Sequence, residues 1–274
     1  MKKDRTRELA AFARVLDVMD ELREKCPWDR KQTIESIRPL TIEETYELSD
    51  AIMDNDMPNV CKELGDIMMH IVFYSSIANE GGKFDIVEAM NKMCDKLIYR
   101  HPHVFSTEKV KDAEQVLQNW EQLKTKEKDG NKRILSGVPE SLPAVIKAYR
   151  MQDKARAVGF DWNNKEEVWD KVKEEVAELE VELRKLSGAK EEIGEEKYRD
   201  LAEKELGDLL FSVINAARLY DLNPDSALEA TCKKFRRRFT YLEEHTIREG
   251  RNLRDMTLEE MDAIWDEAKK QERE

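Results

Sequence analysis

Two pairs of carboxylate residues are the features of this sequence most able to support chemistry. Glu63 and Asp66 lie three residues apart in the first half of the chain, and Glu205 and Asp208 repeat that spacing in the second. Residues at this spacing share one face of a helix. Apolar neighbours place each pair on a helix that is expected to be buried, where a charge needs a partner. Because oxygen ligands suit hard divalent cations, the pairs predict Mg²⁺ sites, with Mn²⁺ as an alternative.

A group of glutamates precedes each pair. Apolar residues at helical spacing predict a helix over Glu166–Leu186. Glu175 and Glu178 lie on one flank of its apolar stripe, and Glu174 points away from the stripe. If this helix packs antiparallel against the helix predicted for Tyr198–Tyr220, four carboxylates converge. An exposed acidic face is the alternative interpretation, and it applies most strongly to Glu174.

The second half of the sequence repeats the first in order and spacing. Such a repeat predicts two tandem four-helix modules, at residues 1–125 and 144–274, with a polar, Gly- and Pro-containing linker at 126–143. More apolar helix surface than one such module can bury predicts a homodimer. The matching residues are Glu44, Glu47, Glu63 and Asp66 with Glu175, Glu178, Glu205 and Asp208, then Lys96 and Arg100 with Lys234 and Arg238, and Trp120 and Lys124 with Trp265 and Lys269.

The composition of the 274 residues narrows the class of protein. Charged residues make up 39% and hydrophobic residues 40%, with only 10 Gly and 7 Pro, which predicts an all-α fold. The net charge of -12 argues against a general nucleic-acid binder. The apolar runs are too short to span a membrane. Four cysteines stand far apart without a C-x-x-C motif, so we expect a cytoplasmic protein.

Basic and aromatic side chains are candidates for contacts with a nucleotide. Lys234 and Arg238 share a helix face in the most basic run of the chain, and both residue types bind phosphate oxygens. Trp265 and Lys269 have the same spacing, and a tryptophan ring can stack on a base. A solvated basic face and a core tryptophan are the alternatives.

The sequence lacks the residue motifs that several other metal, phosphate and hydrolase sites require. A di-iron carboxylate bundle requires Glu-x-x-His, but the residues three before the four histidines are Ile, Ile, Arg and Leu. The sequence also has no H-E-x-x-H motif, no phosphate-binding P-loop, no G-x-G-x-x-G motif and no G-x-S-x-G elbow. Any phosphate would therefore be held by a metal ion and side chains.

Taken together, these residues resemble the MazG family of nucleoside triphosphate pyrophosphohydrolases over essentially the whole chain. The E-E-x-x-E and E-x-x-D motifs occur in both halves, and three further segments are typical of the family: Cys26-Pro27-Trp28-Asp29 through Gln32-Thr33, Arg100–Phe105 and Lys154–Phe160. The resemblance implies an all-α, usually dimeric enzyme. It also implies a Mg²⁺-dependent reaction that converts a nucleoside triphosphate (NTP) to its monophosphate and pyrophosphate.

The resemblance also implies roles for particular residues of this chain. The implied metal ligands are Glu175, Glu178, Glu205 and Asp208, with N-terminal counterparts Glu44, Glu47, Glu63 and Asp66, and the catalytic group is Glu174, Glu175 and Glu178. The implied nucleotide contacts are Lys171, Glu174, Glu175, Leu201, Lys204, Asp208, Lys234, Arg238, Trp265 and Lys269. Leu201 stands where some family members have a lysine near the phosphates, and Lys204, one turn later, is the substitute.

The expected reaction is attack of water on the α-phosphorus, in the C-terminal module above all. Arg100 precedes His101-Pro102, and a proline disfavours helix at the residue before it, so the N-terminal basic helix should end there. Lys234 and Arg238 instead lie within a longer helix. Stacking on Trp265 tolerates any base, which predicts a broad NTP and dNTP range and a house-cleaning role in the nucleotide pool. Two alternatives stay open: a non-catalytic helical protein that binds a regulatory partner, and a related pyrophosphatase specialised for dUTP.

Overall fold

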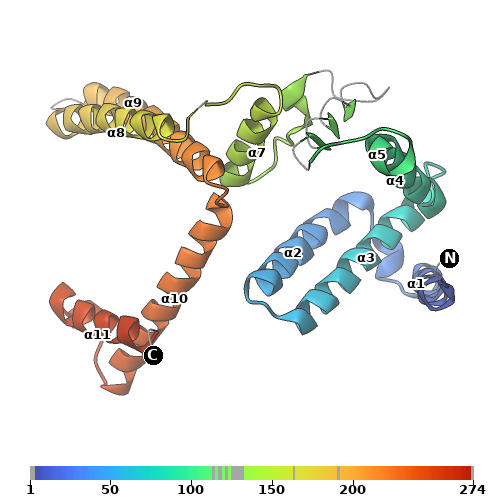
Figure 1. Cartoon of the computed structure of the whole chain (residues 1–274). Coiled ribbons are helices and arrows are strands. Elements are labelled where there is room, and N and C mark those ends of the chain that lie inside the picture. The colour runs from blue at the N-terminus through green and yellow to red at the C-terminus, as the bar shows by residue number, and fades with distance from the viewer. Residues whose placement is uncertain are drawn as a thin grey trace. The chain divides into compact units, whose positions relative to one another are not determined.

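The computed structural model describes residues 4–272 apart from 113–114, 117–118, 121–122, 125–132, 163 and 190–191. These residues form helices, turns and loops without a β-strand, which confirms the all-α prediction (Figure 1). The chain separates into two compact units, Met1–Val116 and Leu117–Glu274. The module boundaries expected from sequence remain a prediction, and residues 126–132 of the expected linker lie outside the described residues.

The N-terminal unit is built around an antiparallel hairpin of two helices. Thr33 and Ser36 form a capping box at the start of α2, and Asp56 caps α3. Between the two helices, Asn55 adopts a φ of 54°, a left-handed conformation that ends many helices. The helices of this unit are α1 (Thr6–Lys25), α2 (Ile34–Met53), α3 (Met57–Glu80), α4 (Ile86–Arg100) and α5 (Pro102–Phe105).

The core of this unit lies where α1 and α2 pack against α3. Met19, Ile37, Val72 and Phe73 are almost fully buried there. Helix α4 ends at Arg100, directly before His101-Pro102, as the sequence predicts. The packing of Ile37 of α2 against Val72 and Phe73 of α3 fixes how the two helices are aligned. This alignment decides which acidic residues of the two helices lie opposite each other.

The C-terminal unit contains a second antiparallel hairpin, formed by α8 and α9. Val168 and Val172 of α8 and Ala216 of α9 form its buried core. The expected helix over Glu166–Leu186 is confirmed to within two residues at each end. Helix α9 begins at Glu192, six residues before the predicted start. The helices of this unit are α7 (Ala144–Arg156), α8 (Glu167–Gly188), α9 (Glu192–Leu219), α10 (Pro224–Arg248) and α11 (Leu258–Gln271).

The expectation that the helix over Tyr198–Tyr220 is buried on all sides is wrong for the single chain. Leu206, Leu210 and Val213 are 44%, 55% and 41% exposed. The reason is that α8 and α7 cover only part of the circumference of α9, and its remaining apolar residues face outward. The predicted homodimer would cover such a surface, and it stays a prediction.

Helices α10 and α11 form a separate contact beyond the α8–α9 hairpin. Leu242, Met256 and Ile264 are buried between them, and Thr257 and Glu260 form a capping box at the start of α11. Helix α10 runs away from the hairpin and carries α11 at its far end (Figure 1). It continues ten residues past Arg238, so the prediction that Lys234 and Arg238 lie within a helix is confirmed.

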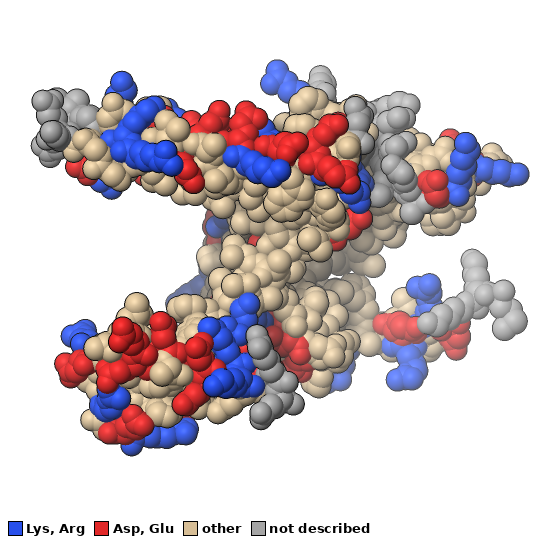
Figure 2. All heavy atoms as spheres, turned by 60° about the vertical axis from the view of Figure 1, so that its left-hand side comes forward, with Lys and Arg blue, Asp and Glu red and all other residues tan. Residues whose placement is uncertain are grey.

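The surface is highly charged but mixed in sign. In the view of Figure 2, Lys and Arg side chains intermix with Asp and Glu and do not gather into a broad basic face. Among the described residues, none of the helices is both long and apolar enough to cross a bilayer.

Candidate metal and nucleotide site

Three of the four carboxylates that were expected to converge in the C-terminal hairpin lie close together. One oxygen each from Glu175, Glu205 and Asp208 can be chosen so that all lie within 4.8 Å of one another. Glu175 comes from α8 and is buried, whereas Glu205 is half-buried and Asp208 is exposed on α9. The i, i+3 spacing of the α9 pair aligns both residues toward α8. We call these three residues the C-terminal acid cluster.

Glu178, predicted as a fourth ligand, lies beside this cluster and outside it. Although Glu178 is exposed, desolvation by its neighbours raises the pKa of its carboxyl above the ordinary value, and the charges of Glu175 and Glu205 raise it further. Glu178, Glu174 and Glu205 also line a shallow hollow of about 380 Å³ on the hairpin surface. Glu178 is therefore close enough to interact electrostatically with the cluster, and as an exposed side chain outside it, Glu178 can act on a group bound there.

A lysine already contacts the buried member of the cluster. The Lys171 Nζ atom lies 2.7 Å from Glu175 Oε1 and 3.0 Å from Glu174 Oε1. These two partners raise the pKa of Lys171, so the ammonium stays charged. Lys171, which was predicted to contact the nucleotide, thus lies directly beside the C-terminal acid cluster. Lys204 is exposed and Leu201 half-buried, each within one or two turns of Asp208 on α9.

The N-terminal hairpin carries an equivalent acid cluster of Glu44, Glu63 and Asp66, with one oxygen of each within 4.8 Å. Burial is the main cause that raises the pKa of Glu44, and Asp66 adds to it. Lys62 lies among these acids. Its Nζ atom is 2.9 Å from Glu63 Oε1, 3.5 Å from Asp66 Oδ2 and 3.7 Å from Glu47 Oε2. Sequence reasoning missed Lys62, whose only signal was its place directly before Glu63.

Both clusters have the chemistry of a divalent-cation site. Their donors are carboxylate oxygens only, which suits Mg²⁺ and Mn²⁺. Each cluster also holds one buried carboxylate, Glu63 or Glu175, and each has a lysine ammonium against it. A buried carboxylate that already attracts a cation is a place where positive charge is stabilised. The residues present therefore fit such a metal ion.

The predicted phosphate and base contacts form a second group, on α10 and α11. Arg238 pairs with Glu272 at 2.6 Å, and the Arg238 guanidinium lies 5.9 Å from the centre of the Trp265 ring. Arg238 and Arg237 lower the pKa of Glu272 to about 2. Phe235 also contacts Trp265, with ring centres 5.2 Å apart.

This second group does not meet the C-terminal acid cluster within one chain. The α8–α9 hairpin and α11 lie at opposite ends of α10 (Figure 1). Lys234 is exposed on α10, and Lys269 pairs with Asp266 on α11 at 2.8 Å. The parts predicted for a single nucleotide site thus occupy two places in the C-terminal unit.

Comparison with known proteins identifies the family. A sequence model of the MazG nucleotide pyrophosphohydrolase domain matches residues 32–105 and again residues 164–242. The chain belongs to the MazG family. The two matched ranges contain both acid clusters, and the second also contains Lys234 and Arg238. The MazG resemblance and the internal repeat predicted from sequence are thus confirmed.

Individual MazG relatives resemble the chain over nearly its whole length. It is 38% identical over 264 residues to the nucleoside triphosphate pyrophosphohydrolase of Escherichia coli K12, which covers 94% of this chain and 97% of the relative. The nucleoside triphosphate pyrophosphohydrolase/pyrophosphatase MazG of Thermotoga maritima is 39% identical over 261 residues, covering 94% and 95%. The protein YabN of Bacillus subtilis is 41% identical over 265 residues, which are 96% of this chain and 52% of YabN.

Proposed function

We propose that this chain hydrolyses nucleoside and deoxynucleoside triphosphates to the monophosphate and pyrophosphate, with Mg²⁺ or Mn²⁺, at its C-terminal acid cluster. The observation that carries the proposal is the convergence of Glu175, Glu205 and Asp208 on one point from two helices. Family membership and the names of the relatives from Escherichia coli and Thermotoga maritima support it.

Bound Mg²⁺ would grip the triphosphate oxygens and neutralise the charge that develops on them. The side chains supply the rest. Glu178, which lines the hollow beside the acid cluster, takes the proton of the attacking water. Lys171, once a phosphate competes for its ammonium, moves from Glu174 and Glu175 to the phosphate oxygens. Glu174 is then the second acceptor for the proton.

We also propose that the enzyme works as a homodimer. Lys234 and Arg238 lie apart from the acid cluster of their own chain, so a second chain must bring such a pair to the leaving pyrophosphate. Exposed Leu206 and Leu210 on α9 supply apolar surface for that association.

A cytoplasmic role in clearing unwanted nucleotides is the physiological part of the proposal. The four cysteines are free, and Cys61, Cys94 and Cys232 are exposed, which suits a reducing compartment.

Product analysis tests the proposed reaction. The full chain is incubated with each NTP and dNTP in Mg²⁺ or Mn²⁺, and the products are separated by anion exchange. We expect the monophosphate and pyrophosphate from several bases, and no turnover after chelation of the metal. Diphosphate with inorganic phosphate would contradict the proposed bond. Absence of turnover with every nucleotide would contradict the proposed hydrolytic activity.

A further inference from the structure

The residue directly after α11, Glu272, binds two arginines of α10 with its carboxylate. Glu272 Oε2 accepts from Arg238 Nε at 3.0 Å and from Arg238 Nη2 at 2.6 Å. The other oxygen, Oε1, accepts from Arg237 Nε at 2.9 Å and from Arg237 Nη2 at 2.5 Å. The Glu272 and Arg238 side chains are 19% and 18% exposed, whereas that of Arg237 is 64% exposed. The two-pronged and largely covered pair with Arg238 is therefore stronger than an ordinary surface ion pair.

The packing of α11 against α10 holds Glu272 in place. Ile264 and Ala268 of α11 are buried, and Glu272 follows at the same four-residue spacing, on the same side of the helix. The Glu272 N–H donates to Ala268 O at 3.3 Å. The neighbouring Gln271 donates its Nε2 hydrogen to Tyr241 Oη of α10 at 2.9 Å. The carboxylate thus projects toward α10 from a fixed backbone.

The ring of Trp265 borders the same arginine. Trp265 and Glu272 are seven residues apart, so at about 100° per residue they point in nearly the same direction, about 10 Å apart along the axis. The Arg238 guanidinium lies 5.9 Å from the centre of the Trp265 ring, within the range of a cation–π contact. The carboxylate and the ring together fix a planar guanidinium, which a lysine ammonium could not replace.

Arg238 keeps one edge of its guanidinium for a ligand. An arginine has five N–H donors, and Glu272 takes one from Nε and one from Nη2. No described residue bonds to Arg238 Nη1. The outer fork of Nη1 and Nη2 is the edge that binds two oxygens of a phosphate group. A hollow of about 450 Å³, lined in part by Arg237, Arg238 and Glu272, gives space for an anion beside it.

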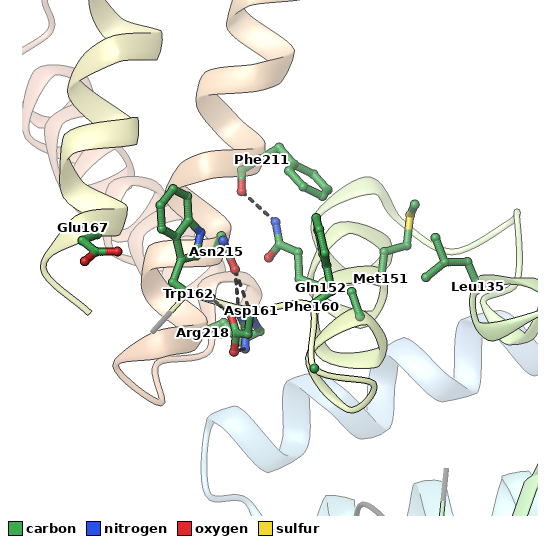
Figure 3. Close-up of a pocket in the computed structure, with 12 residues that line it drawn as sticks. Leu135, Met151, Gln152, Phe160, Asp161, Trp162, Glu167, Phe211, Asn215 and Arg218 are labelled. Carbon is green, nitrogen blue, oxygen red and sulfur yellow. Dashed lines mark hydrogen bonds and ion pairs between the residues drawn. The ribbon is translucent and has the colours of Figure 1, made fainter. Parts of the chain in front are cut away.

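Arg218, the buried arginine of α9, shows the contrasting arrangement (Figure 3). Its Nη1 and Nη2 donate to Asp161, and its Nε and Nη2 donate to Asn215. All three nitrogens of Arg218 are therefore engaged within the protein, and its side chain is only 3% exposed. Such an arginine stabilises the fold. Arg238 differs because its carboxylate partner engages two of the three nitrogens and leaves the third.

We propose that Glu272 is a positioning residue for Arg238. It orients the guanidinium so that the outer fork binds the phosphate groups that leave as pyrophosphate. The inference rests on the proposed function, in which Arg238 contacts that part of the substrate. The negative charge of Glu272 alone repels a polyphosphate, so its contribution comes from the orientation of Arg238. An arginine that is already oriented loses less side-chain freedom when the phosphate binds.

Calorimetric binding to the full chain tests the orientation of Arg238 without any turnover. The ligand is α,β-methylene ATP with Mg²⁺, which cannot be cleaved between the α- and β-phosphates. Adenosine monophosphate (AMP) is the comparison, because it lacks the pyrophosphate part. Glu272→Ala should lower the affinity for α,β-methylene ATP about tenfold, as for one arginine that must be ordered on binding, and leave AMP affinity unchanged.

Two results would overturn the proposal. Unchanged or tighter binding of α,β-methylene ATP in Glu272→Ala would mean that only a negative charge was lost. Equal losses for α,β-methylene ATP and AMP would mean that the substitution damages the packing of α11 as a whole. Glu267→Ala is the matched control, because it removes the same charge from an exposed position of α11, and it should weaken neither ligand.

A double variant tests whether Glu272 acts through Arg238. If it does, adding Glu272→Ala to Arg238→Ala causes no further loss of affinity for α,β-methylene ATP. A further loss in the double variant would show that Glu272 acts by another route and would overturn its role as a positioning residue.

The two proposals fail in different ways. Affinity for α,β-methylene ATP that depends on Glu272, in a chain that turns over no NTP, would remove the proposed function and keep the role of Glu272. NTP turnover in the wild type, with affinity for α,β-methylene ATP unchanged in Glu272→Ala, would keep the function and remove Glu272 from it.

Discussion

Glu175→Gln is expected to abolish most NTP turnover, whereas Glu44→Gln leaves most of it. Each glutamate contributes to an acid cluster of similar geometry, so the ligands alone do not decide which module dominates. The basic helices differ. Helix α4 ends at Arg100, so Arg100 lies in its last turn and Lys96 one turn earlier, close to the helix end where the macrodipole presents negative potential. Arg238 lies well inside α10, in better surroundings for a polyphosphate.

Lys62 points in the same direction. Its ammonium contacts Glu47, Glu63 and Asp66 at once, so the N-terminal acids are partly neutralised by their own chain. Lys171 contacts only Glu175 of the C-terminal acid cluster, whereas Lys62 contacts two members of the N-terminal cluster, Glu63 and Asp66. Competition from Lys62 should therefore weaken metal binding more than competition from Lys171.

Initial rates of pyrophosphate release at saturating NTP measure the two substitutions. Glu180→Gln serves as the matched control, because Glu180 is exposed on the opposite side of α8 and pairs only with Arg184 among the described residues. It should retain the wild-type rate. Equal losses in Glu175→Gln and Glu44→Gln, or the reverse order, would contradict the assignment of the C-terminal module as the main catalyst.

Asp208→Asn is expected to lower turnover by about 10²-fold or more. Mutation of residues that only hydrogen-bond to metal ligands already lowers metal affinity or activity by about 10- to 100-fold. The change keeps the size of the side chain and removes one ligand charge. Helix content should stay the same, because Asp208 is exposed and supports no core contact. Without metal, the unfolding temperature should stay equal or rise, because repulsion from Glu175 and Glu205 is reduced.

Circular dichroism and NTP turnover on the same preparations separate the two effects. Glu203→Gln, an exposed acid on the far side of α9, is the control and should change neither quantity. Turnover near the wild-type rate in Asp208→Asn would remove this carboxylate from the site.

The sequence predicted the helices wherever an apolar stripe marked them. Val168 and Val172 belong to the stripe that defined α8, and both are buried as expected. The start of α9 was missed because residues 192–197 carry no such stripe, although Glu and Lys favour helix. Leu210 shows a second limit. Its apolar side chain marks a surface that gains from burial, but not which chain provides the cover.

Spacing within one helix predicted which site residues share a face, but it did not predict where residues distant in the sequence lie in space. The i, i+3 spacing of Glu205 and Asp208 was enough to predict their convergence with Glu175. Lys62 was missed because residues at i and i+1 do not share a helix face, and only a long, flexible side chain lets its ammonium reach Glu63. The position of Trp265 on α11 depends on the orientation of α10, which cannot be predicted from residue spacing within a helix.

Hydrolysis in water labelled with heavy oxygen tests the central claim most directly. The full chain turns over ATP with Mg²⁺, and mass spectrometry locates the label in the products. Attack on the α-phosphorus at the C-terminal acid cluster predicts label in AMP, unlabelled pyrophosphate, and loss of both products in Asp208→Asn. Label in pyrophosphate, or labelled inorganic phosphate released with ADP, would contradict the account.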